Sequence, residues 1–159
     1  MGRRALLVGI DHYDHITPDL SWCVGDALAM RQTLAFHASH DANFACRTLL
    51  GSRPPNVANA HRQGRVTFNG LRAALEDLLA YDGEVLFYFS GHGMAKTQGA
   101  YLVTQDGTPL LPGMLMNEVL AMANRSSARE VVLLLDCCYA GALGEPLHSL
   151  PASASIRQA

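Results

Sequence analysis

A thiol and an imidazole in this sequence could act together as a nucleophile and its base. His92 stands between Gly91 and Gly93, and Cys138 comes shortly before Gly141. An imidazole that takes the proton of a thiol creates a thiolate nucleophile, and main-chain N–H groups stabilise the oxyanion that forms when the thiolate attacks a carbonyl carbon. Flanking glycines allow a sharp turn and leave the His92 ring uncovered. The pair predicts acyl transfer through a covalent intermediate; the plainer alternative is a turn histidine bonded to a local carbonyl.

The four cysteines are predicted to have different fates. Their spacing fits neither zinc ligands nor a disulfide framework, so we expect free thiols in a reducing compartment. Cys23 and Cys46 are interpreted as small buried hydrophobic residues, the usual fate of a free cysteine. Cys137 is expected to end a strand and point into the sheet, because neighbours along a strand face opposite sides. A redox pair of Cys137 and Cys138, or a metal site, is the less favoured alternative.

Alternating strands and helices are needed to position these residues, and the pattern of apolar residues predicts them. Strands are expected over Ala5–Ile10, Phe44–Leu50, Glu84–Ser90, Tyr101–Thr104 and Val131–Leu135, and helices over Ser21–Phe36, from a Thr67 cap to Asp82, and from about Met114 to Asn124. This alternation predicts an α/β fold with a mostly parallel sheet covered by helices on both faces. Ligands bind such sheets at the carboxyl ends of the strands, where polar segments stand at residues 11–14, 90–93 and 136–141.

Composition excludes several classes of protein. The chain has 159 residues, 49% of them hydrophobic and 16% charged, which is typical of a single globular domain. Its net charge is -2 and its basic residues are scattered, so we expect no contact with nucleic acid. The apolar run Ala5–Ile10 is too short for a signal peptide or a membrane span. We therefore expect a cytoplasmic protein without a membrane partner.

Two segments resemble the catalytic signatures of the caspase-like cysteine proteases. Residues 88–93 (YFSGHG) and 135–141 (LDCCYAG) are similar to the patterns Ser-Gly-His-Gly and Asp-x-Cys-x-Ser/Ala-Gly of the metacaspase and bacterial caspase-like (orthocaspase) branch. The similarity extends from Arg4 to about Gly141. It implies the three-layer caspase-like fold and a thiol endopeptidase that works through an acyl-enzyme.

The resemblance also implies a role for each site residue. The nucleophile of the pattern stands two places after the Asp, which favours Cys138 over Cys137. His92 would be base and acid, and the N–H groups of Gly93 and Cys138 would form the oxyanion hole. A backbone carbonyl, and not a third carboxylate, is expected to orient the histidine in this family.

Two carboxylates are expected to determine substrate preference. Residues 20–27 (LSWCVGDA) match a metacaspase stretch whose Asp, here Asp26, lines the pocket for the residue before the scissile bond, together with Asp136. Paired carboxylates bind a guanidinium and repel an acidic side chain. Cleavage after Arg is expected, with Lys second and Asp not accepted, and Arg157 is a candidate self-processing site. The alternative is that Asp26 caps a helix or lies on its exposed surface, and that Asp136 binds strand-end amides.

The chain departs from the family pattern in two ways. Tyr139 stands where metacaspases usually carry His, which is expected to alter only the rim of the cleft. The sequence stops 21 residues after Cys138 (159 − 138), whereas the family fold continues through a cleavable linker into a small subunit. We therefore expect residues 1–141 to form the large-subunit catalytic domain and residues 142–159 a flexible linker or processed tail. A second chain or a continuation would supply the small subunit, with a regulatory domain as a further partner and processing or a partner as the activating event.

No cofactor is expected, and calcium is not expected to be required. Between Gly93 and the cysteine motif the chain offers only Asp106, Glu118 and Glu130, too few and too spread for the six or more oxygen ligands of Ca²⁺.

Two other functions compete with proteolysis. A phospho-acceptor receiver domain would also place Asp11 and Asp136 at strand ends, but it requires a lysine near the phosphoryl group, and the only lysine, Lys96, is expected in a loop. A caspase-like scaffold that binds partners without cleaving them is the second alternative, although an intact His92 and Cys138 argue against it.

Overall fold

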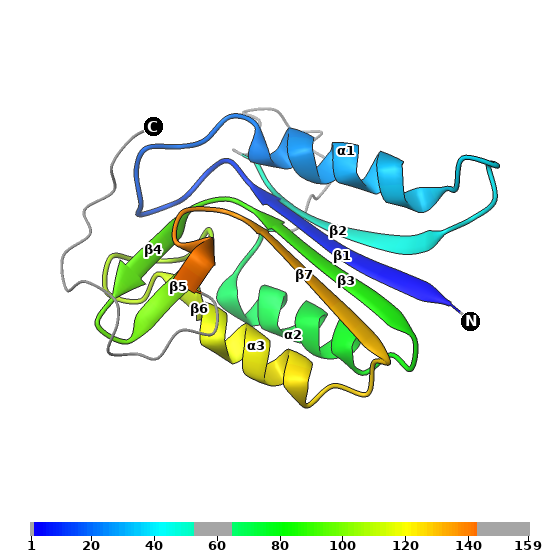
Figure 1. Cartoon of the computed structure of the whole chain (residues 1–159). Coiled ribbons are helices and arrows are strands. Elements are labelled where there is room, and N and C mark those ends of the chain that lie inside the picture. Colours follow the sequence, from blue (N-terminus) through cyan, green and yellow to red (C-terminus); the bar gives the residue numbers. More distant parts are fainter. Residues whose placement is uncertain (1, 53–64, 143–159) are drawn as a thin grey trace.

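Four parallel strands form the central sheet of the computed structural model, which describes residues 2–52 and 65–142. Their order is β2-β1-β3-β7 (Figure 1), and their bounds are β1 Arg3–Ile10, β2 Phe44–Gly51, β3 Glu84–Ser90 and β7 Glu130–Asp136. Each neighbouring pair is parallel, so all four carboxyl ends lie at one edge of the sheet. The predicted α/β fold with a mostly parallel sheet is confirmed.

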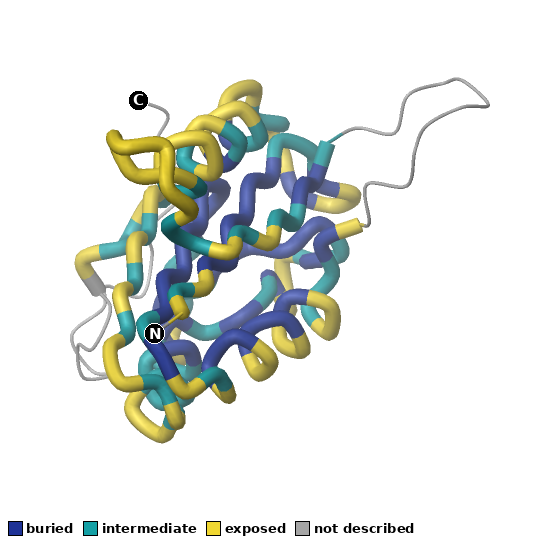
Figure 2. The backbone as a smooth tube through the Cα atoms, turned by 90° about the vertical axis from the view of Figure 1, so that its right-hand side faces the viewer, coloured by how far each residue is buried: buried dark blue, intermediate teal, exposed yellow. Residues whose placement is uncertain are grey.

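Helices lie on both sides of this sheet. Helix α1 (Cys23–Ala35) covers one face, and α2 (Phe68–Leu79) and α3 (Met116–Asn124) lie on the other side (Figure 1). Alternate residues of β3 enter two separate cores: Phe87 and Phe89 pack on the α2 side, and Leu86 and Tyr88 on the α1 side. Both faces of β1 and β3 are therefore buried (Figure 2), which explains their unbroken apolar sequences.

Helix α2 forms where its sequence pattern predicts it. The Thr67 hydroxyl accepts the N–H of Gly70 at 3.1 Å and caps the helix, as expected. Leu71, Leu75 and Leu78 recur at helical spacing and are buried against the sheet. The helix ends at Leu79, three residues before the predicted Asp82.

A small antiparallel sheet was only partly predicted. Its strands are β4 (Gly93–Lys96), β5 (Gly99–Val103) and β6 (Gly113–Leu115), in the order β4-β5-β6. The helix expected from about Met114 begins two residues later, at Met116, because Met114 pairs with Leu102. Lys96 ends β4 instead of lying in a loop. Since β4 begins directly after His92, this sheet fixes the chain on one side of that residue; the Val103 N–H also donates to the His92 carbonyl at 3.0 Å.

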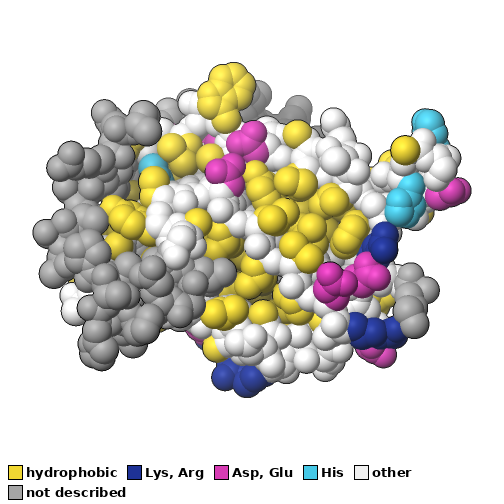
Figure 3. All heavy atoms as spheres, viewed as in Figure 1, with side chains coloured by type: hydrophobic (Ala, Val, Ile, Leu, Met, Phe, Trp, Pro, Cys, Tyr) yellow, Lys and Arg dark blue, Asp and Glu magenta, His cyan; other side chains and the backbone are white. Residues whose placement is uncertain are grey.

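Strand β7 is less covered by other elements than the prediction of helices on both faces implies. Its residues alternate between half-buried and exposed, and on the α1 side Val132 and Leu134 are 37% and 40% exposed. Hydrophobic side chains gather over this side of the molecule (Figure 3). Within residues 2–52 and 65–142, no strand pairs with the outer edge of β7. Of the helices in those ranges, none is both long and apolar enough to cross a membrane.

Candidate active site

The carboxyl edge of the sheet brings the His92 and Cys138 segments into contact. Ser90 at the end of β3 is in register with Asp136 at the end of β7, and each candidate residue follows two positions later. At Gly93 a Cβ atom would overlap the Cys138 carbonyl and lie 3.2 Å from the Cys138 nitrogen. Two main chains approach this closely only where one of them carries no side chain. The predicted nucleophile and base segments are therefore neighbours.

His92 is held on two sides by the loop that joins β1 to α1. Its Nε2 lies 2.7 Å from the carbonyl oxygen of Pro18, and its ring stacks at a 40° tilt on Tyr13, with the centroids 4.8 Å apart. A carbonyl oxygen only accepts, so Nε2 carries a hydrogen and Nδ1 is the nitrogen that can accept a proton. The ring is oriented by a backbone carbonyl, as the family resemblance implied.

The expectation that flanking glycines leave the ring uncovered is wrong. His92 is only 8% exposed. Neither Gly91 nor Gly93 has a positive φ, so a sharp left-handed turn is not the reason for these glycines. Instead, each permits a close approach: the Cys138 main chain lies against Gly93, and a Cβ at Gly91 would come within 2.8 Å of the Tyr13 hydroxyl.

Cys138 lies in a turn directly after β7 and is exposed, in contrast to the other three thiols. Cys137 is half-buried against the core although β7 already ends at Asp136. Burial, together with the neighbouring Cys138 and Asp136, raises the pKa of Cys137 to about 12, so its thiol stays protonated near neutral pH. Burial also raises the pKa of Cys23 and of Cys46; Cys23 is buried as predicted, whereas Cys46 is only half-buried.

Tyr139 holds the turn in a conformation that is uncommon for its residue type. Its φ is 63°, in the left-handed region, and the Ala140 N–H donates to the Cys137 carbonyl at 3.3 Å across the turn. The Tyr139 side chain is half-buried against the main core. Core packing of this side chain provides a physical reason for the backbone to tolerate the strain.

The two predicted substrate-binding carboxylates lie on the same side of the sheet. Ser90, in register with Asp136, donates from Oγ to Asp26 Oδ2 at 3.5 Å, and the Tyr88 hydroxyl donates to Asp136 Oδ2 at 3.4 Å. Burial raises the pKa of Tyr88, and both carboxylates raise it further, so Tyr88 remains a donor. Ser90 and Tyr88 are buried, whereas Asp26 and Asp136 are exposed. The two exposed carboxylates therefore lie next to the buried polar side chains of Tyr88 and Ser90.

The alternative describes Asp26 in part, because this residue lies exposed in the first turn of α1, but it does not describe Asp136. The cap of α1 comes from Asp11, whose Oδ1 accepts the N–H groups of Cys23 at 2.8 Å and Val24 at 3.4 Å. Asp26 is left to face Ser90, and Asp136 accepts from a phenol instead of a strand-end amide. The Asp11 carboxylate is thereby committed to α1, and the Lys96 Nζ donates to the Pro109 carbonyl, so neither matches the receiver-domain pattern.

Sequence reasoning missed several residues that shape the site: Tyr13, Pro18, Asp19, Tyr88 and Ser90. The polar run at residues 11–14 marked the correct loop, but nothing in it indicated which atoms would reach His92. Arg157 and the predicted tail lie outside the described residues, except for its first residue, Ala142. Within the described ranges, no group of three or more His, Cys, Asp or Glu side chains is placed to hold a metal ion.

Two of three comparisons with known proteins found a match to this chain. A family model described as Caspase domain matches residues 2–157. A comparison with curated protein sequences found no match. Among solved structures, the chain is similar to the crystal structure of a protein from Geobacter sulfurreducens, with a TM-score of 0.63 and 19% sequence identity. The likeness covers 87% of this chain and 51% of that one, so this chain spans about half of the other's length. At this identity the likeness establishes a shared fold.

The contact between Gly93 and Cys138 predicts opposite effects for two glycine substitutions. Gly93→Ala should lower the free energy of unfolding by about 1–3 kcal/mol, because the added methyl group meets rigid main chain. The matched control is Gly25→Ala in α1, where the methyl group meets nothing within 4 Å and should raise stability by roughly 0.5–1 kcal/mol. Denaturant unfolding measures both, and equal effects at the two positions would contradict the close approach.

Proposed function

Because the chain belongs to the caspase-domain family of cysteine peptidases, we propose that it is an endopeptidase that cleaves after basic residues, Arg in preference to Lys. The observation that carries the proposal is the arrangement around His92. Its ring is oriented through Nε2 by the Pro18 carbonyl, and the next residue, Gly93, lies against the main chain of an exposed cysteine. The acidic side chains of Asp26 and Asp136 belong to the same edge of the sheet.

In each half of the proposed reaction His92 accepts one proton and then donates it. Its Nδ1 takes the thiol proton of Cys138, and the thiolate attacks the carbonyl carbon of the scissile peptide bond. The C–N bond then breaks, the amine leaves with the proton from His92, and the substrate's acyl group stays on Cys138. Water, deprotonated by His92, attacks this thioester and releases the acid and the free thiol. The Pro18 carbonyl stabilises the charged imidazolium without taking a proton.

Main-chain N–H groups are proposed to stabilise the oxyanion. The tetrahedral intermediate carries a negative oxygen next to the sulfur, so its donors have to lie close to Cys138. The Gly93 and Cys138 N–H groups are the candidates, and the approach of the two main chains supports their acting on one oxygen. A side chain at position 93 would separate these donors.

In this proposal Asp26 and Asp136 form an acidic pocket that gives a preference for a basic residue. Asp26 and Asp136 are exposed, and from the residues that the structure describes they receive only long hydrogen bonds, of 3.5 Å from Ser90 and 3.4 Å from Tyr88. Their remaining acceptor capacity suits a guanidinium, whose planar set of N–H donors reaches two carboxylates at once. The compact ammonium of Lys binds with fewer fixed bonds, and an acidic side chain would be repelled by both.

We propose that a small-subunit segment, from a second chain or from a continuation of this one, adds to the outer edge of β7. An apolar face is normally covered in a stable domain, whereas Val132 and Leu134 are partly exposed here. The likeness covers only 51% of the similar Geobacter chain, which supports a further segment beyond the one described here.

The remaining assignments concern the whole protein. Residues 1–141 form the catalytic domain in this proposal, and cleavage after Arg157 or binding of a partner or regulatory domain activates it. Free thiols favour a reducing compartment, and we propose a cytoplasmic location and activity that does not require calcium.

If His92 and Cys138 form the catalytic dyad, replacing either one should abolish turnover. Cys138→Ala and His92→Ala should each lower peptide turnover at least about 1000-fold, since the two groups act as a unit, and Cys137→Ala should retain most activity. An irreversible thiol-directed peptide probe should label the parent protein and Cys137→Ala but not Cys138→Ala. Activity in Cys138→Ala and none in Cys137→Ala would reverse the assignment. No labelling of the parent protein would favour the scaffold function.

Replacement of either carboxylate of the proposed pocket should weaken the selectivity for Arg while His92 and Cys138 stay functional. Asp26→Asn and Asp136→Asn should each raise KM for a fluorogenic Arg peptide by roughly tenfold, because each removes a charge-assisted hydrogen bond. Asp77→Asn is the control, since Asp77 is an exposed carboxylate on α2, on the other side of the sheet. Faster cleavage of a matched Asp peptide, or unchanged KM in both pocket variants, would contradict the pocket.

Binding can be followed separately from turnover in the same pocket. Trp22 is the chain's only tryptophan and lies one helical turn before Asp26. In Cys138→Ala protein, an Arg-ended peptide should change its fluorescence, and the Asp26→Asn change should weaken that response.

The open edge of β7 predicts where the small subunit binds. In the longer gene product, Leu134→Asp should abolish association and activity, because it places a charge on a face that the partner covers. Ala45→Asp is the matched control, since Ala45 is exposed on β2 at the opposite edge of the sheet. Gel filtration and peptide turnover measure the two effects. Unimpaired assembly of Leu134→Asp would place the partner elsewhere.

A further inference from the structure

We propose that Tyr13, braced by Asp19, is a positioning residue that holds His92 in line with Cys138. This inference rests on the proposed function, because it assumes that His92 is the base of a Cys-His dyad. It goes beyond that function by assigning to the loop between β1 and α1 a role in the reactivity of the thiol.

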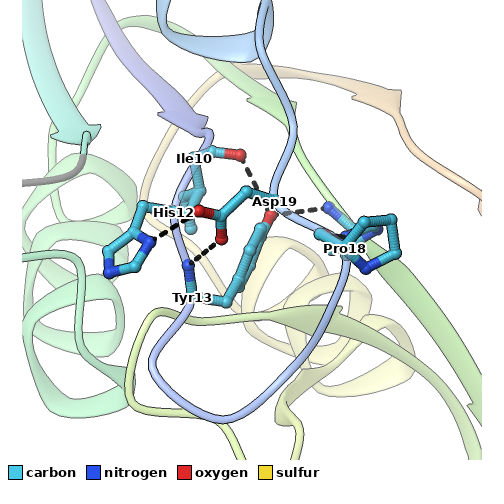
Figure 4. Close-up of polar contacts among 6 residues, drawn as sticks. Ile10, His12, Tyr13, Pro18 and Asp19 are labelled. Atoms are coloured by element: carbon cyan, nitrogen blue, oxygen red, sulfur yellow. Dashed lines mark hydrogen bonds and ion pairs between the residues drawn. The ribbon is translucent and has the colours of Figure 1, made fainter.

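The Tyr13 hydroxyl is tied to the main chain of His92. It accepts the His92 N–H at 2.8 Å and donates to the Ile10 carbonyl, at the end of β1, at 3.1 Å (Figure 4). Tyr13 is 3% exposed, so no water competes freely for these bonds. Burial raises the pKa of Tyr13 well above its ordinary value, and the phenol therefore stays protonated and keeps both partners.

The same tyrosine also supports the His92 ring. Its own ring stacks beside the imidazole, while the Pro18 carbonyl holds Nε2. The ring is thus fixed by one side chain and one main-chain oxygen from a single loop. Gly91 makes this possible, since a side chain there would meet the Tyr13 hydroxyl.

Asp19 connects two parts of this loop through its carboxylate. Its Oδ1 accepts the Tyr13 N–H at 3.3 Å and its Oδ2 lies 2.9 Å from Nδ1 of His12. Pro18 directly precedes Asp19, so the carboxylate fixes the carbonyl that orients His92 relative to the phenol that supports it (Figure 4). The carboxylate is half-buried and does not itself contact His92 in any of these bonds.

The test uses the reactivity of Cys138 and does not require turnover. Iodoacetamide labelling of Cys138, followed by peptide mass spectrometry, is measured at about pH 6 and about pH 10, below and above the ordinary thiol pKa. A well-placed imidazole keeps the thiolate at low pH, whereas at high pH the thiolate forms without help. The ratio of the two rates therefore reports the placement of His92.

Tyr13→Phe removes the hydroxyl and keeps the ring. The His92 N–H then loses its acceptor, and the low-pH to high-pH labelling ratio should fall roughly tenfold toward the His92→Ala value. Tyr81→Phe, in the turn between α2 and β3 at the other end of the sheet, is the control and should leave the ratio unchanged. Asp19→Asn should lower the ratio in the same direction and serves as the second variant if Tyr13→Phe does not fold.

The outcomes separate this inference from the proposed function. A normal ratio in folded Tyr13→Phe overturns the positioning role, even if unfolding shows a loss of stability. A normal ratio in Asp19→Asn overturns the bracing role. If the parent protein already has the His92→Ala ratio, the dyad itself fails, and both proposals fail with it.

Discussion

The parallel register of β1, β3 and β7 is the constraint on which the rest of the structure depends. It places Gly9, Ser90 and Asp136 in one row, so that the three loops after these strands leave the sheet side by side. Each loop supplies something different: the first holds the histidine, the second carries it, and the third carries the cysteine. A shift of one residue in any strand would turn its side chains to the opposite face and separate these groups.

The need of buried main-chain groups for hydrogen-bond partners explains which contacts the main chain around His92 makes. A strand that ends inside the protein leaves N–H and carbonyl groups that need partners, and an unpaired buried group costs free energy. The Tyr13 hydroxyl pairs with one such N–H and one such carbonyl, and the Val103 N–H pairs with the His92 carbonyl. The bonds that complete the fold at this point are therefore the same bonds that fix the position of the imidazole.

Elements whose pattern depends on local sequence could be predicted, and those that depend on distant pairing could not. The β3 bounds are as predicted, because the apolar run Val85–Phe89, buried on both faces, is a strong local signal. The α2 cap at Thr67 is also a local signal. By contrast, β4 and β6 have four and three residues, and each exists because it pairs with β5.

The candidate site divides in the same way. His92, Cys138, Asp26 and Asp136 stand in short motifs that mark their positions. Pro18 acts through a carbonyl oxygen, which every residue type carries, so no sequence pattern could distinguish it. Tyr13 and Asp19 gain their roles only from the path of the loop, and that path is set by contacts with β1, α1 and β3.

The two halves of the proposed dyad are supported unequally, and this difference suggests how activity and assembly are connected. His92 follows a central strand, with β1 on one side and β7 on the other, and its loop is held by Tyr13 and Pro18. Cys138 follows β7, which pairs with β3 on one side only among the described strands and continues into a turn with a strained Tyr139. Edge strands open more readily than central ones, because fewer bonds hold them. A segment that pairs with β7 would stabilise the cysteine side of the site far more than the histidine side, so completing the sheet and aligning the nucleophile would be one physical event.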